Sequence, residues 1–234
     1  MGQVILFTMQ NTMDCIVLVA NETHTGFAQQ ICDEMEASAK ARGTGIAKRS
    51  PDYVAGKMLE GKAVIAFSAA GTWAGFCYIE TWGHGQYVAN SGLIVAPAFR
   101  KSGLARSIKQ QIFELSRNKY PGAKIFGLTT GLAVMKINSE LGYEPVTYSE
   151  LTNDDEFWKG CRSCVNFEIL VSKDRKNCLC TAMLYDPSAL AKKPGTAGDQ
   201  FRKRSKLYER WLRFKKHVLL RSIEKSKKVF ITLF

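Results

Sequence analysis

The sequence predicts an α/β protein, more closely an α+β mixed sheet around one core, and two changes of pattern along the chain carry this prediction. Residues 63–68, 73–82 and 87–96 are β-branched and aromatic runs joined by short glycine-containing turns, which predicts an antiparallel meander of three strands. From residue 102 to residue 120 the apolar positions recur at helical spacing, and a strand-like run follows at 124–129. A strand, a helix and a strand in that order predict a parallel crossover, so the sheet is mixed.

The remaining elements follow from start and stop residues. Residues 15–20 predict a first strand, and residues 24–42 predict a helix that Gly43 ends. Ser50 and Pro51 are the residue types of an N-cap and a first helical position, so a second helix is expected there. Further along, the pattern predicts a short helix at 132–141, a strand at 143–148 and a final hairpin from 165–171 and 179–183.

Composition and charge suggest the domain organisation. The chain has 234 residues, of which 46% are hydrophobic and 23% are charged, as in a soluble globular protein with a real core. Twelve Lys and Arg but only two Glu fall within 201–228, so most of the net charge of +12 lies there. We therefore expect an extension at 1–12, a domain at 13–185, a linker at 186–200 and a basic amphipathic helical tail at 201–234.

The tail is expected to use its apolar arc, which contains Leu207, Trp211 and Phe214, to dock on the domain or on a second subunit of a homodimer. An anionic membrane surface and RNA are the alternatives, but no recognition motif supports nucleic acid, so none is expected. No apolar run approaches the ~20 residues that cross a bilayer. The start lacks a basic region before its apolar stretch, and Leu6 breaks the myristoylation pattern, so we expect a cytoplasmic protein.

The stretch most informative about function is residues 91–106, SGLIVAPAFRKSGLAR. An apolar strand runs through Pro97 into the basic segment Arg100-Lys101-Ser102-Gly103 and then into an amphipathic helix. The first turn of a helix has unsatisfied N–H groups and a positive dipole end, so such a junction binds phosphate oxygens. A basic loop that caps the helix without any ligand is the alternative interpretation.

The same residues resemble a known family. The pattern Arg100-x-x-Gly103-x-Ala105, directly after Val95-x-Pro97, is similar to the coenzyme A pyrophosphate loop of the GNAT acyltransferase superfamily. A second family segment, an apolar helix that ends in Gly-Tyr, matches residues 133–143, and the resemblance covers roughly residues 13–172. It implies a GNAT-like fold and acetyl-CoA, or another acyl-coenzyme A, as co-substrate. It also implies that the coenzyme is held by Leu93, Ile94, Val95, Arg100, Lys101, Ser102, Gly103, Leu104, Ala105, Arg106 and Asn138.

The resemblance implies direct attack by a substrate amine on the thioester, which requires a base. Glu80 is the best candidate because it lies late on the strand beside the one that leads to the motif, although an outward, solvated Glu is an equal alternative. His84 is a second candidate in a glycine turn. The family commonly has a tyrosine acid where this chain has Asn138, and Tyr148 is a substitute candidate, with a core or rim tyrosine as the alternative.

The acceptor pocket of the family is walled by the segment between the first two helices. Here that segment contains Arg42, Lys48 and Arg49, which are candidates to bind a substrate carboxylate, or else form a solvated basic loop. The stretches GTGIAKRSP, GLTTGLAVMKINSELGYEP and FWKGC also resemble short bacterial GNAT proteins proposed to acylate the α-amine of glutamate in arginine biosynthesis. The predicted function is therefore acyl transfer to a small-molecule amine, perhaps an acidic amino acid. The alternatives are a protein lysine or N-terminal acetyltransferase and a non-catalytic coenzyme A sensor.

Seven cysteines without a secretory signal argue against a disulfide framework. Four of them, Cys161, Cys164, Cys178 and Cys180, have the number of thiolates that tetrahedral zinc needs. The one-residue spacing of the second pair is less usual than two, so free cysteines without metal are favoured over a structural zinc.

Overall fold

The computed structural model describes residues 15–43 and 48–191, and the account below is confined to them. Contacts divide the chain into Met1–Pro187, which holds every strand described, and Ser188–Phe234. The predicted extension at 1–12, most of the predicted linker and the basic tail lie outside the described residues. Among the helices that are described, none combines the length and the apolar character needed to cross a bilayer.

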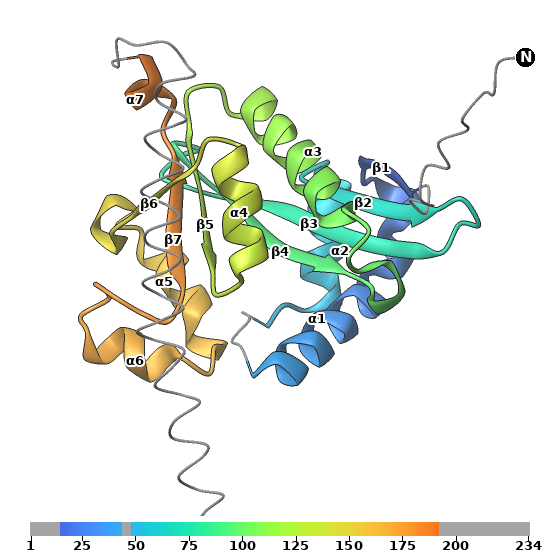
Figure 1. Ribbon diagram of the computed structural model, residues 1–234, viewed down its shortest axis with the longest axis horizontal. Coiled ribbons are helices and arrows are strands. Elements are labelled where there is room, and N and C mark those ends of the chain that lie inside the picture. The colour runs from blue at the N-terminus through green and yellow to red at the C-terminus, as the bar shows by residue number, and fades with distance from the viewer. Residues whose placement is uncertain (1–14, 44–47, 192–234) are drawn as a thin grey trace, which may run out of the picture. The chain divides into compact units, whose positions relative to one another are not determined.

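Seven strands form one mixed sheet in the order β1-β2-β3-β4-β5-β7-β6 (Figure 1). Their bounds are β1 Cys15–Val19, β2 Ala63–Ser68, β3 Trp73–Trp82, β4 Tyr87–Val95, β5 Lys124–Thr129, β6 Glu144–Val146 and β7 Thr181–Tyr185. Strands β1 to β4 pair antiparallel, and β4 pairs parallel with β5. The predicted α/β fold, with a meander followed by a crossover, is therefore confirmed.

Helices of the first unit lie on both faces of this sheet. The described helices and 3₁₀ turns are η1 Glu22–Phe27, α1 Ala28–Arg42, α2 Pro51–Leu59, η2 Pro97–Phe99, α3 Leu104–Lys119, α4 Leu132–Glu140, η3 Tyr148–Glu150, α5 Asp155–Lys159, η4 Gly160–Ser163, α6 Phe167–Ser172 and, across the boundary to the second unit, α7 Pro187–Ala191. Figure 1 shows α3 and α4 in front of the sheet. A Cβ on Gly75 of β3 would lie 2.5 Å from Ile108 of α3. Tyr78, three residues later, faces the other way and packs against Tyr53 of α2.

Two helix boundaries follow the predicted start and stop residues. The Ser50 side chain accepts a hydrogen bond from the Tyr53 N–H, and Pro51 opens α2, as predicted. Gly43 ends α1 in the left-handed conformation, with φ 58°. The first helix begins later than predicted, because Asn21 caps a 3₁₀ turn, and α-helical pairing starts only at Ala28.

The predicted final hairpin is wrong. Residues 167–172 form α6, in which the more buried residues, Phe167 and Leu170, are three positions apart with exposed residues between them, a helical spacing and not strand alternation. The later run does form a strand, β7, but it lies between β5 and β6 and pairs antiparallel with both. Strand β6 is shorter than predicted and lies at the sheet edge, where Pro145 is tolerated.

Candidate active site

Strands β4 and β5 separate part of the way along their length. Their parallel pairing ends at Ala89 with Phe126, after which β5 continues paired with β7 on its other side. Residues 90–95 of β4 therefore have a neighbour strand, β3, on one side only. The backbone of Leu93, Ile94 and Val95 lies along this opening, which Figure 1 shows between β4 and β5.

A bulge bends β4 beside the opening. The register with β3 changes between Tyr78, which pairs with Ser91, and Phe76, which pairs with Ile94, so β4 has one residue more than β3 there. Gly92 takes φ +64° at this point, and a Cβ on it would lie 2.3 Å from the Tyr78 ring. Only glycine fits this position. The sequence prediction of an unbroken strand missed the bulge, although a glycine inside a strand pattern is its usual mark.

The loop before α3 presents backbone N–H groups that have no protein acceptor. Within the described residues, no hydrogen bond is made by the amides of Lys101, Ser102, Gly103 and Ala105. Lys101 and Gly103 both have positive φ, 65° and 86°, which turns successive amides toward the start of the helix. A Cβ on Gly103 would meet nothing within 4 Å, so this side of the loop is open next to Gly103.

This arrangement fits an anion. Unpaired amides at the start of a 16-residue helix combine directed donors with the positive end of the helix dipole. Ser102 comes directly before the N-cap of α3. The N-cap is Gly103, while the Ser102 hydroxyl donates to the Phe99 carbonyl and closes the turn.

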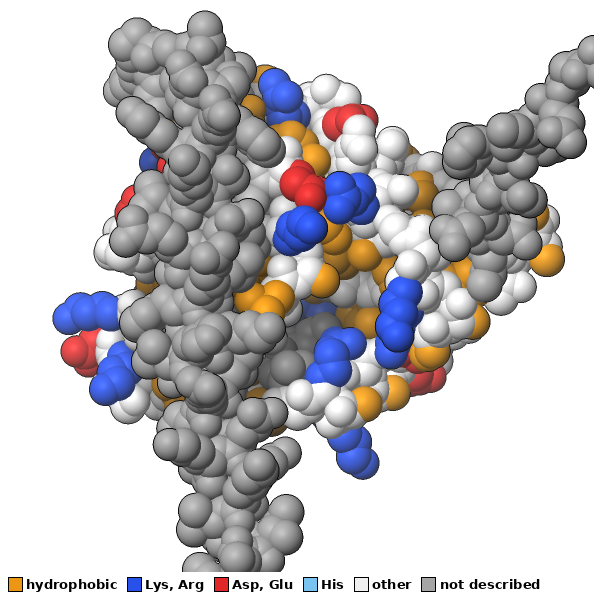
Figure 2. Space-filling view, in the orientation of Figure 1, with side chains coloured by type: hydrophobic (Ala, Val, Ile, Leu, Met, Phe, Trp, Pro, Cys, Tyr) orange, Lys and Arg blue, Asp and Glu red, His pale blue; other side chains and the backbone are white. Residues whose placement is uncertain are grey.

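Arg100 and Arg106 are held by carboxylates of the chain itself. Arg100 Nη2 lies 2.8 Å from Glu34 and 2.6 Å from the Ser38 hydroxyl, while its Nε donates to the Val95 carbonyl. Arg106 pairs with Glu140 of α4 at 2.5 Å. Figure 2 shows apolar surface bordered by Lys and Arg side chains on this face. The structure thus assigns Arg100 an anchoring contact between the loop and α1, and Arg106 one between α3 and α4.

On the other face of the sheet, Glu80 is at the centre of a small side-chain network. Its Oε1 accepts from Arg49 Nη2 at 3.0 Å and from the Tyr53 hydroxyl at 2.6 Å. Glu80 is 7% exposed, so the solvated, outward orientation that the sequence left open is not what the structure shows. Within the described residues, Glu80 Oε2 has no hydrogen-bond partner.

Burial shapes the protonation of this network. Burial, together with the negative charge of Glu80, raises the pKa of Tyr53, so its hydroxyl remains a donor to the carboxylate. Burial opposes the charge on Arg49, but Tyr78, Glu80 and Tyr53 together outweigh it and raise the pKa of the guanidinium. Arg49 Nε is also a buried donor with no protein acceptor in the described part of the chain. Sequence analysis missed Tyr53, although its place four residues after Arg49, across the Ser50 cap, was the available sign.

The other predicted substrate and base residues lie apart from this network. Lys48 forms an exposed pair with Glu36 at 2.8 Å. Arg42 lies at the end of α1, where burial and the charge of Arg100 lower its pKa. Of the three predicted substrate residues, Arg49 alone contacts Glu80, and the role of all three in binding a substrate stays a prediction. His84 lies in the turn between β3 and β4, at the end where β4 and β5 are still paired.

Asn138 and Tyr148, the candidates for contact with the leaving thiolate of the coenzyme, are both buried. Asn138 is 1% exposed, its Oδ1 has no partner among the described residues, and its Nδ2 lies 3.8 Å from the Met183 sulfur. The Tyr148 hydroxyl donates to the Cys180 carbonyl at 3.0 Å, and its ring packs on Trp158. Burial raises the pKa of Tyr148, and the nearby thiols Cys180 and Cys178 add to this effect.

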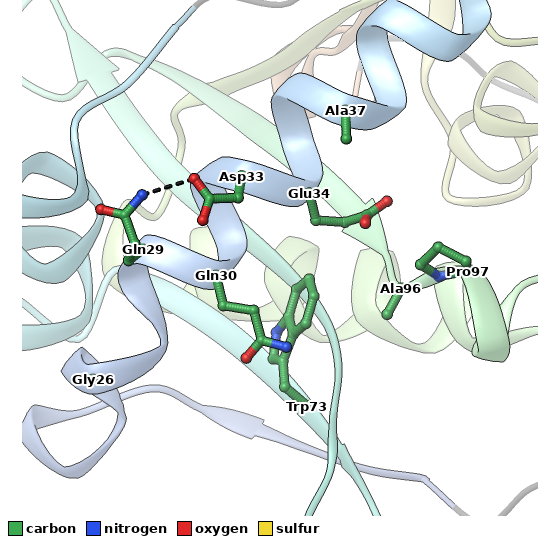
Figure 3. Close-up of a pocket in the computed structure, with 9 residues that line it drawn as sticks. All are labelled: Gly26, Gln29, Gln30, Asp33, Glu34, Ala37, Trp73, Ala96 and Pro97. Atoms are coloured by element: carbon green, nitrogen blue, oxygen red, sulfur yellow. Dashed lines mark hydrogen bonds between the residues drawn. The ribbon is translucent and has the colours of Figure 1, made fainter.

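A further cavity lies beside α1. It has a volume of about 580 Å³ and opens between α1, the start of β3 and the end of β4, lined by Gln30, Glu34 and Trp73 among others. Figure 3 shows the side chains of α1, including Glu34 and a Gln29–Asp33 hydrogen bond, facing this space. Two carboxylates and no cation line it, so its chemistry does not suit a diphosphate. The splayed strands and the loop amides remain the better candidate site.

Comparison with known proteins bears on the fold. No protein-family model matches the sequence, and no curated protein matches it. Solved structures do match: N-acetylglutamate synthase from Neisseria gonorrhoeae, complexed with coenzyme A and N-acetyl-glutamate, aligns over 74% of this chain with 15% identity and a TM-score of 0.54. The aligned part is 35% of that chain, so this protein corresponds to about a third of the Neisseria enzyme.

Two smaller proteins align over nearly their whole length. Rv2747 from Mycobacterium tuberculosis, solved with CoA, shares 15% identity and a TM-score of 0.53 over 73% of this chain and 98% of its own. Diaminobutyrate acetyltransferase from Paenibacillus lautus, complexed with its substrate and coenzyme A, shares 8% identity and a TM-score of 0.50, over 75% and 96%. At such identities the likeness concerns architecture. The chain has the fold of the GNAT acetyltransferases.

Proposed function

We propose that this protein is an N-acyltransferase that moves an acetyl or another short acyl group from acyl-coenzyme A to the primary amine of a small molecule. The observation that carries the proposal is the set of unpaired amides at Lys101, Ser102, Gly103 and Ala105, next to the opening between β4 and β5. Four directed donors at a helix start suit the diphosphate of the coenzyme. The fold likeness to CoA-bound acetyltransferases supports the same assignment.

The rest of the coenzyme has suitable partners along the opening. Backbone groups of Leu93 and Ile94 on the side of β4 that faces away from β3 are available to the amides of the pantetheine arm, because β5 no longer pairs with β4 there. Asn138 Oδ1, buried without a partner, suits a donor from the thiol end of that arm. The bound coenzyme supplies a thioester whose carbonyl carbon receives the amine while the carbon–sulfur bond breaks.

Glu80 is the residue we propose as the base. Its Oε1 is held by Arg49 and Tyr53, and this leaves Oε2 to accept a proton from the substrate ammonium. Glu80 of β3 pairs with Ala89 of β4. Ala89 lies two residues before Ser91, where the bulge of β4 begins. The Arg49–Tyr53 anchor fixes the carboxylate orientation, which is the usual requirement for efficient proton transfer.

Arg49 supports an amino acid as the acceptor. Its Nε is a buried donor that lacks an acceptor in the described residues, and a substrate carboxylate would satisfy it. Together, Glu80 Oε2 and Arg49 Nε offer one site for an ammonium and one for a carboxylate. This pairing suits an α-amino acid, and we propose glutamate, as an early reaction of arginine biosynthesis in the cytoplasm.

A free-thiol release assay tests the proposal. The full chain is incubated with acetyl- or succinyl-coenzyme A and each of the twenty amino acids, and products are identified by mass spectrometry. We expect thiol release with glutamate and an N-acyl product. Turnover only with lysine side chains or N-termini of proteins would replace this function with protein acetylation. Tight coenzyme binding without turnover on any acceptor would replace it with a sensor role.

A further inference from the structure

The four cysteines of the C-terminal half of the domain converge on one place. Cys161 belongs to η4, Cys164 follows it, and Cys178 and Cys180 lie in the segment that leads into β7. All four line a single cavity of about 30 Å³. That volume is enough for one or two water-sized particles, so it suits a single ion. We call these four residues the cysteine cluster.

The first pair is arranged around a tight turn. The Cys164 N–H donates to the Cys161 carbonyl at 3.0 Å, which closes the turn. The Asn166 N–H then donates to the Cys164 sulfur at 3.4 Å. A backbone donor on a cysteine sulfur stabilises the thiolate form and is the kind of outer contact that orients metal ligands.

The second pair is held against the first by neighbouring residues. The Cys178 thiol points to the Asn166 carbonyl at 3.8 Å, so Asn166 contacts one cysteine of each pair. The Cys180 carbonyl accepts the hydroxyl of Tyr148 at 3.0 Å, which fixes the backbone at the entry to β7. Two cysteines from a turn and two from the segment before β7 therefore line the same cavity.

The segment around the cluster consists of short helices, α5, η4 and α6, each six residues or fewer. Trp158 and Leu170 belong to a buried apolar cluster of the domain, and Cys161 and Cys178 pack against that cluster. On the outer side of the segment, Val165 is 76% exposed and Leu179 is 57% exposed. The cysteine cluster therefore lies between the domain core and an exposed, irregular surface.

We propose that Cys161, Cys164, Cys178 and Cys180 bind one structural Zn²⁺ ion. Four thiolates are a complete tetrahedral ligand set, and such closed sites are structural ones. Within the described residues, no three His, Cys, Asp or Glu side chains are placed to hold a metal ion, so the proposal requires the four thiols to rotate toward the cavity that they line. Each thiol that binds gives its proton to solvent, and no oxidant or reductant takes part.

The ion would also support the acceptor side of the candidate active site, an extension that rests on the proposed function. The Lys48 N–H donates to the Ser163 hydroxyl at 3.0 Å, between the first two cysteines. A Cβ on Gly160 would lie 3.4 Å from Arg49 Nη2, so the backbone next to Cys161 packs against the Arg49 guanidinium. Zinc that fixes this turn thereby fixes Arg49, and through it Glu80.

Zinc content is the first test, because it needs no enzymatic activity. The full chain, produced in zinc-supplemented medium, is analysed by inductively coupled plasma mass spectrometry. We expect about one zinc per chain in the wild type and in the control Cys32→Ser, a half-buried cysteine of α1, and at least a tenfold loss in Cys164→Ser and Cys180→Ser. Zinc-free wild-type protein whose thermal unfolding is unchanged by Zn²⁺ or by a chelator would overturn the proposal.

Cobalt substitution keeps the proposal testable if the serine variants do not fold. Wild-type protein stripped of zinc and titrated with Co²⁺ should show the intense thiolate-to-cobalt charge-transfer bands and the visible bands of a tetrahedral site, with saturation at one equivalent. An intact mass two or four daltons below the reduced chain would assign the cluster to disulfides and reject zinc. Zinc binding without acyl transfer would leave this proposal standing while the proposed function fails.

Discussion

The loop before α3 and the Glu80 network are two halves of one candidate site that are built in different ways. The loop consists of consecutive residues, 100–106, and its binding groups are backbone amides. The network joins Arg49, Tyr53 and Glu80, which are up to 31 residues apart, and its binding groups are side chains. A backbone site is therefore open to prediction from a short motif, whereas a side-chain site depends on how distant elements pack.

The largest effect is expected from a substitution of Glu80, in the side-chain half of the candidate site. Glu80→Gln removes the proposed base but keeps the size of the side chain, so kcat should fall by about 10²–10⁴-fold. Coenzyme binding, measured by calorimetry, should stay within about twofold, because the loop amides are untouched. Glu36→Gln removes a carboxylate from an exposed pair with Lys48 and is the matched control, with activity close to the wild type. Equal activity of the two variants would remove Glu80 from catalysis.

A charged side chain at position 103 is expected to disrupt the backbone half of the site, the amides of the loop before α3. Gly103→Glu places a carboxylate among the diphosphate oxygens, and we expect coenzyme affinity to fall at least 100-fold, about 2.7 kcal/mol. Gly122→Glu is the control, since Gly122 has nearly the same φ, 85° against 86°, and the same open surroundings. It lies beyond the other end of α3, which is about 24 Å long. Unchanged affinity of Gly103→Glu in calorimetry would contradict the loop assignment.

The contrast between a local backbone site and a side-chain site built from distant residues also separates the features that could be predicted from the sequence from those that could not. The order of strands up to β5 and the loop were predictable, because the β-branched and aromatic runs, Pro97 and Gly103 act on their immediate neighbours. The insertion of β7 between β5 and β6 was not, because a strand's neighbour is chosen by tertiary packing. For the same reason, nothing in the sequence indicated that Arg49, and not Lys48, would pair with Glu80, since both precede α2 and carry the same charge.

A smaller effect is expected when the hydrogen bond from Tyr53 to Glu80 is removed. Tyr53→Phe removes one hydrogen bond to the carboxylate and leaves the Arg49 contact in place, so kcat should fall by about tenfold, in line with ~1.5 kcal/mol for a hydrogen bond to a charged group. Because the pKa of Tyr53 is raised, its hydroxyl stays protonated through pH 10. The wild-type rate profile should therefore show no loss of this anchor below that pH. An unchanged kcat in Tyr53→Phe would show that Arg49 alone positions Glu80.

The smallest effect is expected at Arg100, and it distinguishes two roles within the loop. The Arg100 guanidinium binds Glu34 and Ser38, and the pair is partly exposed, so it contributes about 0–1 kcal/mol to the placement of the loop. Arg100→Gln should therefore weaken coenzyme binding only about threefold. If the role is anchoring, Glu34→Gln should weaken binding to a similar extent, because it releases the same contact. If Arg100 instead contacts the diphosphate, Glu34→Gln should strengthen binding by removing a negative charge nearby. Calorimetry of the two variants decides between a loop held in place by α1 and a loop that carries its own charged ligand.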